Sequence, residues 1–324
     1  MSGSISRIFR PRLALVNDIK AAVATDVAQR IAPGGTDRVF ALARLAKPGI
    51  VAAVLLAGFS GMVLASQGWP DGRTGVVCLV CLFLAAAGSA IINGVLDAPL
   101  DVQMARLHKR VTALETAGRK RVTAIALTGI GIALILALRY LGSLTFYLIL
   151  AAVLSYTLLY TLRLKRRSPW GAVPGGIPGA LPALIGYAAA AHTLRLDAVI
   201  LFAVMLLWQP PHFWALALEY RHDYTAAGLP VLPAVHGEKF TRLLIFIYAT
   251  ALLPASLALW LFGFCSSWYA GAALACWVGF LAACYFFLVR TRRCAVAFRA
   301  SILYLMLLFA AIVGDICCIQ RALP

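Results

Sequence analysis

Three polar side chains at a four-residue spacing end a long apolar run. Asn93, Asp97 and Asp101 follow about twenty apolar residues, and on a helix this spacing places all three on one face. Two like charges one turn apart destabilise a helix by about 0.2–0.5 kcal/mol unless a cation lies between them. Oxygen ligands suit Mg²⁺ better than zinc. The spacing therefore predicts a magnesium site at the mouth of a membrane helix, and a solvated helix end is the alternative.

A second pair of carboxylates, Glu219 and Asp223, is also four residues apart and lies among aromatic side chains. Two such pairs at one membrane face could hold Mg²⁺ on both sides of one diphosphate. The aromatic faces could stabilise an allylic carbocation by cation–π attraction, although an interfacial belt of aromatic residues has the same composition. His212, near the end of the preceding apolar run, is either a hydrogen-bonded core histidine or a residue that handles haem or protons.

A basic cluster, Lys165, Arg166 and Arg167, ends another apolar run. Such a cluster either anchors a helix at the cytoplasmic face or neutralises the charge of a diphosphate leaving group. The following segment, 174–182, has three prolines at four-residue spacing together with several glycines. It predicts a loosened helix whose backbone a neighbouring helix or a flat ligand can approach closely.

The composition places these residues in a membrane protein. The chain is 62% hydrophobic and 13% charged, with a mean hydropathy of +0.89, which is too apolar for a soluble domain. Lipid-spanning runs of this length are helical, because every backbone polar group must be paired within the segment. We therefore expect an all-α integral membrane bundle of about nine transmembrane helices. The expected spans are 48–66, 75–96, 121–139, 142–162, 172–191, 197–218, 242–262, 267–289 and 299–317.

The positive charge follows the membrane topology. The formal net charge is +17, and 25 of the 29 lysines and arginines fall on one side of the nine expected spans. This asymmetry predicts a cytoplasmic N-terminus and a C-terminus on the opposite side, and it explains the charge without nucleic acid. Residues 1–46 are expected to form a basic cytoplasmic tail on anionic lipid, and residues 47–324 the membrane domain. A bacterial plasma membrane fits this tail better than a mitochondrial one, since transit peptides are poor in acidic residues.

Other features exclude several functions. Most of the eight cysteines lie in apolar runs, where cysteine acts as a small hydrophobic residue, so we expect no disulfide framework. Cys78 and Cys81 have no histidine or second cysteine pair nearby, which disfavours a zinc or redox role. The expected midplane carries almost no ionisable side chain, and this disfavours a transporter.

Taken together, the three polar stretches resemble the UbiA superfamily of membrane prenyltransferases, and most closely its haem-farnesylating branch. The pattern NxxxDxxxDxxMxRTxxRP is matched by Asn93, Asp97, Asp101, Met104, Arg106 and Arg110. The pattern YTxxLKRRTPxN with GGxxGAxP is matched by Tyr160, Thr161, Leu164, Lys165, Arg166, Arg167, Pro169, Gly175, Gly176, Gly179, Ala180 and Pro182. The pattern PHFWALA with DYxxAGxPMLP is matched by residues 211–217 and by Asp223, Tyr224, Ala227, Gly228, Pro230, Leu232 and Pro233. Departures at Leu107, Val111, Ser168, Gly171 and Val231 replace the usual Thr, Pro, Thr, Asn and Met.

The resemblance implies a helical bundle around a cavity that opens to the bilayer, with farnesyl diphosphate and haem B as substrates and Mg²⁺ as cofactor. It implies that Asn93, Asp97, Asp101 and Asp223 act in catalysis. The metal ligands that it implies are Asp97, Asp101, Asp223 and Glu219. The substrate-binding residues that it implies are Arg106, Lys109, Arg110, Tyr160, Lys165, Arg166, His212, Trp214 and Tyr224. The product, haem O, would pass to downstream haem-modifying or oxidase-assembly proteins.

Two alternatives remain open. The first is a UbiA-type enzyme that prenylates another aromatic acceptor, which predicts a fuller run of aspartates in the third stretch. The second is a non-catalytic haem-binding assembly protein, because the departures at Leu107, Val111 and Gly171 lie around the expected diphosphate site.

Overall fold

The computed structural model describes residues 35–319, so most of the expected tail at 1–46 lies outside the described residues. Within that range every regular element is helical. The long helices are α3 (Pro48–Ser66), α4 (Gly72–Asp101), α6 (Arg119–Tyr140), α7 (Ser143–Leu154), α9 (Ile177–Ala191), α10 (Leu196–Glu219), α13 (Glu238–Leu261), α14 (Ser267–Cys284) and α15 (Cys294–Gly314). The shorter helices are α2 (Gly35–Leu45), α5 (His108–Ala117), α8 (Lys165–Arg167), α11 (Arg221–Ala226) and α12 (Leu232–Val235).

Eight helical segments of the described chain are long and apolar enough to cross a membrane. The expected span at 172–191 becomes α9, which has only 15 helical residues after a 3₁₀ turn at Pro174–Gly176. With α9 as a shorter ninth member, the all-α membrane bundle expected from the sequence is confirmed.

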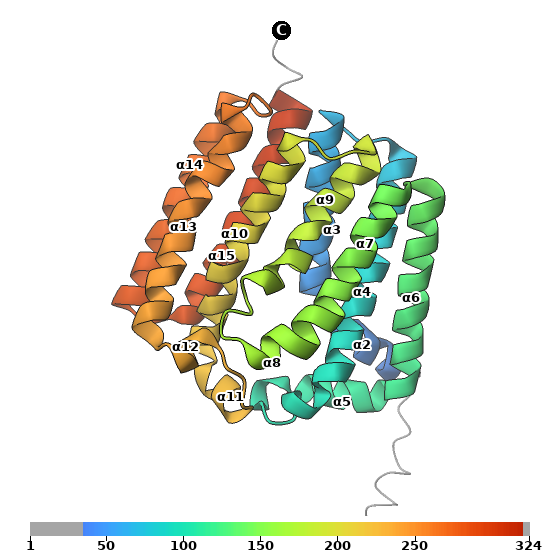
Figure 1. Ribbon diagram of the computed structural model, residues 1–324, viewed down its shortest axis with the longest axis vertical. Helices are drawn as coiled ribbons and strands as arrows, with labels where there is room; N and C mark the ends of the chain where they lie inside the picture. The colour runs from blue at the N-terminus through green and yellow to red at the C-terminus, as the bar shows by residue number, and fades with distance from the viewer. Residues whose placement is uncertain (1–34, 320–324) are drawn as a thin grey trace, which may run out of the picture.

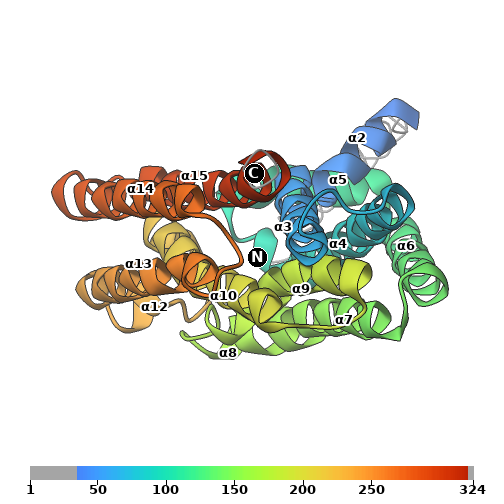
Figure 2. The same ribbon diagram turned by 90° about the horizontal axis from the view of Figure 1, so that it is seen from above.

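The long helices run side by side, and the short ones gather at one end of the bundle. Figure 1 shows α5, α8, α11 and α12 together at the lower end, and the end of α15 at the opposite end. Seen from above, the bundle is elongated, with α13 and α14 at one end and α6 at the other (Figure 2). The three polar stretches therefore meet at one end of the bundle, as expected for loops on a single membrane face.

Helix α4 carries the first acidic pattern beyond its apolar part. The Asp71 carboxylate caps its N-terminus by accepting a hydrogen bond from the Thr74 amide at 2.9 Å. The helix then runs for 30 residues, through Pro99, to Asp101. Asn93, Asp97 and Asp101 are all buried on this helix, so the prediction that they line one helix face is confirmed.

Helix α7 continues as a π-helix over Ser155–Leu164 and ends in α8, so that one span covers Ser143–Arg167. The wider turn allows the Thr161 hydroxyl to donate a hydrogen bond to the Tyr156 carbonyl, five residues earlier, at 2.8 Å. π-Bulges occur frequently at functional sites because they change which side chains share a face. Here the π-helix directs Thr161 and Lys165 toward α4.

The glycines of α9 permit close helix contact, as the 174–182 pattern predicts. A Cβ atom at Gly186 would overlap the Gly58 carbonyl of α3, and one at Gly179 would overlap the Gln209 side chain of α10. Helix α9 thus fills the centre of the bundle against two other helices, and the glycines serve packing at these positions.

Candidate active site

Asp97 is buried near the end of α4 and accepts hydrogen bonds from its own helix and from the segment that follows the π-helix. Its Oδ2 atom accepts from the Lys165 ammonium at 2.6 Å and from the Asn93 amide at 2.9 Å. Its Oδ1 atom lies 3.6 Å from the Arg166 guanidinium and has no hydrogen-bond partner in the described chain. The first two polar stretches therefore meet at this carboxylate, with one oxygen left open.

Asp101 has the same asymmetry one turn later. Its Oδ2 atom forms an ion pair with Arg110 of α5, while its buried Oδ1 atom has no hydrogen-bond partner among residues 35–319. Burial lowers the pKa of Arg110, and the negative charge of Asp97 opposes this shift. Lys109, next to Arg110, is exposed on α5.

Asp223 joins the third stretch to the first through Arg106. The Arg106 Nε and an Asp223 carboxylate oxygen are 3.2 Å apart. The guanidinium lies 4.3 Å from the centre of the Tyr220 ring and 5.1 Å from that of Tyr224, which adds cation–π attraction. Beneath this pair, an apolar cluster is formed by Met104, Ala227 and Leu229, packed against Leu100, Leu107 and Tyr224. Leu107, one of the departures from the family pattern, thus lies in a local apolar contact.

Glu219 and Asp223, the second pair of carboxylates, lie on two different helices and have different partners. Helix α10 ends at Glu219, Tyr220 breaks the helix, and α11 begins at Arg221. The Glu219 carboxylate instead accepts a hydrogen bond from the Ala295 amide, at 2.8 Å, in the first turn of α15. A carboxylate at this place caps a helix and interacts favourably with its dipole.

His212 has the contacts of a core histidine. Its Nδ1 atom lies 2.8 Å from the Ser301 hydroxyl of α15. Its ring is stacked between Trp208, at 4.3 Å between centroids, and Phe298, at 4.4 Å. These contacts satisfy one ring nitrogen and both ring faces.

Lys47 is a site residue that the sequence patterns missed. It occupies the left-handed bend between α2 and α3, with φ 54°, and its ammonium donates to the Asn93 Oδ1 at 2.6 Å. Burial lowers the pKa of Lys47 to about 7, with Arg110 and Lys165 adding to the effect and Asp97 opposing it. A lone lysine directly before Pro48, at the mouth of an apolar run, is the signal that could have identified it.

Aromatic side chains form two further groups, one on the π-helix and one around Trp214. Tyr156 and Tyr160 of the π-helix are stacked with centroids 6.0 Å apart, and Phe213 of α10 lies 6.4 Å from Tyr160. A Cβ atom at Gly175 would overlap the Tyr160 ring, so this glycine lets the ring lie against the backbone. Trp214 is buried against Trp170 and Tyr248, and its indole N–H has no partner among the described residues.

The acids present fit a divalent cation bound by oxygen. No group of three histidine, cysteine or acidic side chains converges within residues 35–319. The described residues therefore supply two candidate carboxylate ligands, Asp97 and Asp101, and not a complete coordination sphere. Each of these carboxylates has one buried oxygen without a hydrogen bond. Mg²⁺ is commonly held by one or two carboxylates, with phosphate oxygens and water completing the octahedron. Two open carboxylate oxygens fit that pattern.

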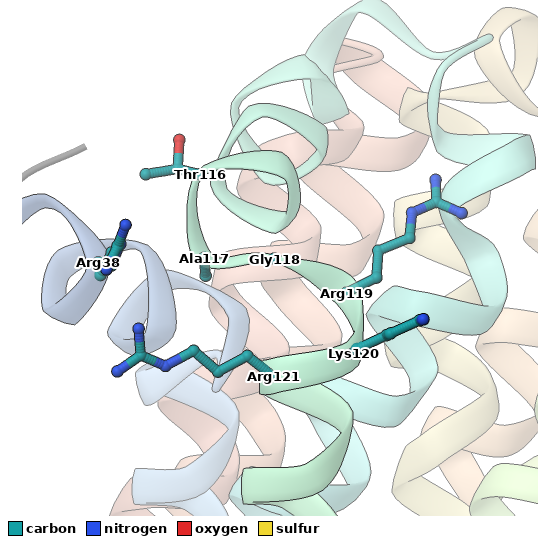
Figure 3. A pocket seen from close by; sticks show the side chains of 7 residues that line it. All are labelled: Arg38, Thr116, Ala117, Gly118, Arg119, Lys120 and Arg121. Atoms are coloured by element: carbon teal, nitrogen blue, oxygen red, sulfur yellow. The ribbon is translucent and has the colours of Figure 1, made fainter. Parts of the chain in front are cut away.

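A separate basic hollow lies away from these acids. It has a volume of about 490 Å³ and is lined by Arg38, Thr116, Ala117, Gly118, Arg119, Lys120 and Arg121. Figure 3 shows that Arg38 and Arg121 approach each other from α2 and the start of α6, whereas Arg119 and Lys120 point to the other side. Its lining within residues 35–319 is basic and contains no acidic side chain.

The fold and the paired acids and cations define a membrane prenyltransferase. The chain belongs to the UbiA prenyltransferase family, whose sequence profile matches residues 54–312. Its similarity to protoheme IX farnesyltransferase of Geotalea uraniireducens (strain Rf4) is 55% identity over 256 residues, covering 79% of this chain and 99% of the relative. The expected resemblance to the haem-farnesylating branch is thereby confirmed.

Solved structures show the same fold at low sequence identity. A digeranylgeranylglyceryl phosphate synthase superposes with a TM-score of 0.69 at 18% identity, covering 86% of this chain and 98% of that one. A UbiA homologue from Archaeoglobus fulgidus bound to GPP and Mg²⁺ superposes with a TM-score of 0.60 at 15% identity, covering 84% and 99%.

Proposed function

We propose that this prenyltransferase moves the farnesyl group of farnesyl diphosphate to a vinyl group of haem B, giving haem O and diphosphate. The 55% identity to a protoheme IX farnesyltransferase over nearly its whole length supports the choice of both substrates. The observation that carries the proposal is the contact of Lys165 with Asp97 at 2.6 Å, with the second Asp97 oxygen left open. This contact joins an acid suited to a metal with a cation suited to a diphosphate.

The cations of the site would bind the diphosphate. Lys165, Arg166, Arg110 and Arg106 come from two polar stretches, and each lies within 4 Å of a carboxylate of the cluster. When an anionic substrate enters, these cations can exchange their carboxylate partners for phosphate oxygens, which form strong charge-assisted hydrogen bonds. The exchange would leave no buried charge without a partner, and it releases the carboxylates toward a metal.

Asp97 and Asp101 would hold the metal, and Asp223 would be the third metal-binding acid. Mg²⁺ would neutralise the negative charge that develops on the leaving diphosphate. The Archaeoglobus homologue of the same fold, bound to GPP and Mg²⁺, supports this assignment. Glu219 is omitted from the proposed metal ligands because its carboxylate caps α15.

The reaction breaks the bond between C1 of the farnesyl group and its bridging oxygen, and diphosphate leaves with the electron pair. The π electrons of the haem vinyl group form the new carbon–carbon bond to C1. Water then adds to the resulting cation and loses a proton, which leaves a hydroxyl group on the product. The Tyr156, Tyr160 and Phe213 rings can stabilise the allylic cation and exclude water from it until the new bond has formed.

A different aromatic acceptor is the competing substrate. To distinguish the two acceptors, membranes containing this protein are incubated with haem B, farnesyl diphosphate and Mg²⁺. The haems are then analysed by mass. We expect a haem whose mass increases by one farnesyl group and one hydroxyl group. Farnesylation of a hydroxybenzoate or quinone precursor, with haem B unchanged, would contradict the proposal.

We further propose that the protein lies in a bacterial plasma membrane, with the end that carries the site facing the cytoplasm. The basic residues near this end, including Lys165, Arg166 and Arg167, support that orientation. An alkaline phosphatase fused to the C-terminus should be active in intact cells, and the same fusion at the N-terminus inactive. The reverse pattern would exclude this topology. The product would pass to downstream haem-modifying or oxidase-assembly proteins.

A further inference from the structure

We infer that Thr161 is a positioning residue that fixes the Asn93 amide and, through it, selects which oxygen of Asp97 faces the metal. The inference rests on the proposed function, because it concerns the metal carboxylate of that reaction. Thr161 lies on the π-helix and would touch neither metal nor substrate. It would act by orienting a residue that contacts the metal carboxylate.

The direction of each hydrogen bond in this network follows from the chemistry of the groups. A carboxylate can only accept, so the Asn93 NH₂ group must face Asp97 Oδ2, at 2.9 Å, and its nitrogen also lies 3.0 Å from the Thr161 hydroxyl. The Asn93 oxygen then points the other way and accepts from Lys47 at 2.6 Å. Both amide hydrogens therefore have an acceptor.

The π-helix determines that Thr161 accepts this bond. The single hydroxyl hydrogen of Thr161 is donated to the Tyr156 carbonyl at 2.8 Å, so only its oxygen lone pairs remain for Asn93. In a regular α-helix, a threonine hydroxyl bonds the carbonyl four residues earlier, as Thr123 of α6 does to Arg119 at 2.9 Å. The five-residue register of Thr161 thus aligns its oxygen with the amide on α4.

The network leaves one oxygen of Asp97 available. Oδ2 is occupied by Asn93 and Lys165, at 2.9 and 2.6 Å, whereas Oδ1 accepts no hydrogen bond. If Thr161 offers no acceptor, the amide group loses a partner in a buried environment and no longer holds Oδ2 in one direction. The carboxylate can then rotate, and metal affinity falls.

The test compares two buried threonines on the same span. Thr161→Val removes the acceptor while keeping the side-chain shape, Thr161→Ser restores the hydroxyl, and Thr157→Val is the matched control. Binding of Mn²⁺ to the purified protein in the presence of inorganic diphosphate is measured by electron paramagnetic resonance, and thermal unfolding checks the fold. We expect Thr161→Val to weaken Mn²⁺ binding about tenfold, from the loss of one buried hydrogen bond. Thr161→Ser and Thr157→Val should stay within about twofold of the wild type.

A second set of variants distinguishes the proposed role of Thr161 from a folding defect. Lys47→Met removes the other partner of the Asn93 amide and should weaken Mn²⁺ binding in the same direction. In an Asn93→Ala background, Thr161→Val should have no further effect, because both act through one amide. An unchanged Mn²⁺ affinity in Thr161→Val, an equal loss in Thr157→Val, or a full effect without Asn93 would each overturn the inference. Because Mn²⁺ binding needs no turnover, failure of the haem assay would overturn the proposed reaction alone.

Discussion

Lys165 and Asp97 are 68 residues apart in the chain, and their side chains meet at 2.6 Å. The lysine follows the π-helical end of one span, and the aspartate lies on the face of another. Their contact joins two spans at the helix that carries Asp97 Oδ1 and Asp101 Oδ1, two buried carboxylate oxygens without a hydrogen bond. Several measurable consequences follow from this geometry.

Asp97→Asn should reduce prenyl transfer by at least about a hundredfold, because the variant removes the negative charge proposed to hold the metal. The side-chain volume is nearly unchanged, so the protein should still insert and unfold cooperatively. Steady-state turnover in detergent over a range of Mg²⁺ concentrations is the measurement. Turnover equal to the wild type at every Mg²⁺ concentration would remove Asp97 from the metal site.

Lys165→Ala should raise the KM for farnesyl diphosphate by about tenfold or more, because a charge-assisted hydrogen bond to phosphate is lost. Arg167→Ala is the matched control, since Arg167 belongs to the same basic cluster but is exposed. Both variants lose one positive charge, so the membrane-anchoring contribution changes equally. If the two KM values rise together, the cluster serves as an anchor and not as a phosphate site.

Glu219→Gln and Asp223→Asn should have different effects. Glu219→Gln should lower the unfolding temperature, because it weakens the cap of α15 by about 1 kcal/mol, and should leave the Mg²⁺ dependence within about twofold. Asp223→Asn should reduce activity, because Arg106 loses its ion-pair partner beside the site. Titration of activity with Mg²⁺ and thermal unfolding separate the two. A strong Mg²⁺ dependence in Glu219→Gln would restore this residue as a ligand.

Gly186→Ala should destabilise the bundle by about 1–3 kcal/mol, because the added methyl group overlaps the Gly58 carbonyl between α9 and α3. Gly131→Ala is the control, since Gly131 lies within α6 and a Cβ atom there meets nothing within 4 Å. The control should be neutral or stabilising by up to about 1 kcal/mol, as expected for a helix-interior glycine. Unfolding in detergent by heat or denaturant gives both values. Equal stability of the two variants would contradict the close α3–α9 contact.

The sequence alone determined the class of the molecule and the position of its first acidic face. Long apolar runs require helices in lipid, because no water is present to pair the backbone. The four-residue spacing of Asn93, Asp97 and Asp101 places them on one face of any helix that contains them, whatever packs against it. Both features are local, so they could be predicted before any contact was known.

Only the tertiary structure decided the partners of these residues. Glu219 and Asp223 have the same spacing as Asp97 and Asp101, yet the helix ends between them and their carboxylates take different partners. The contacts of Asn93 with Lys47 and Thr161 join residues 46 and 68 positions apart. Such contacts depend on how whole helices pack and where a π-turn shifts the register. Neither can be predicted from the local periodicity of the sequence.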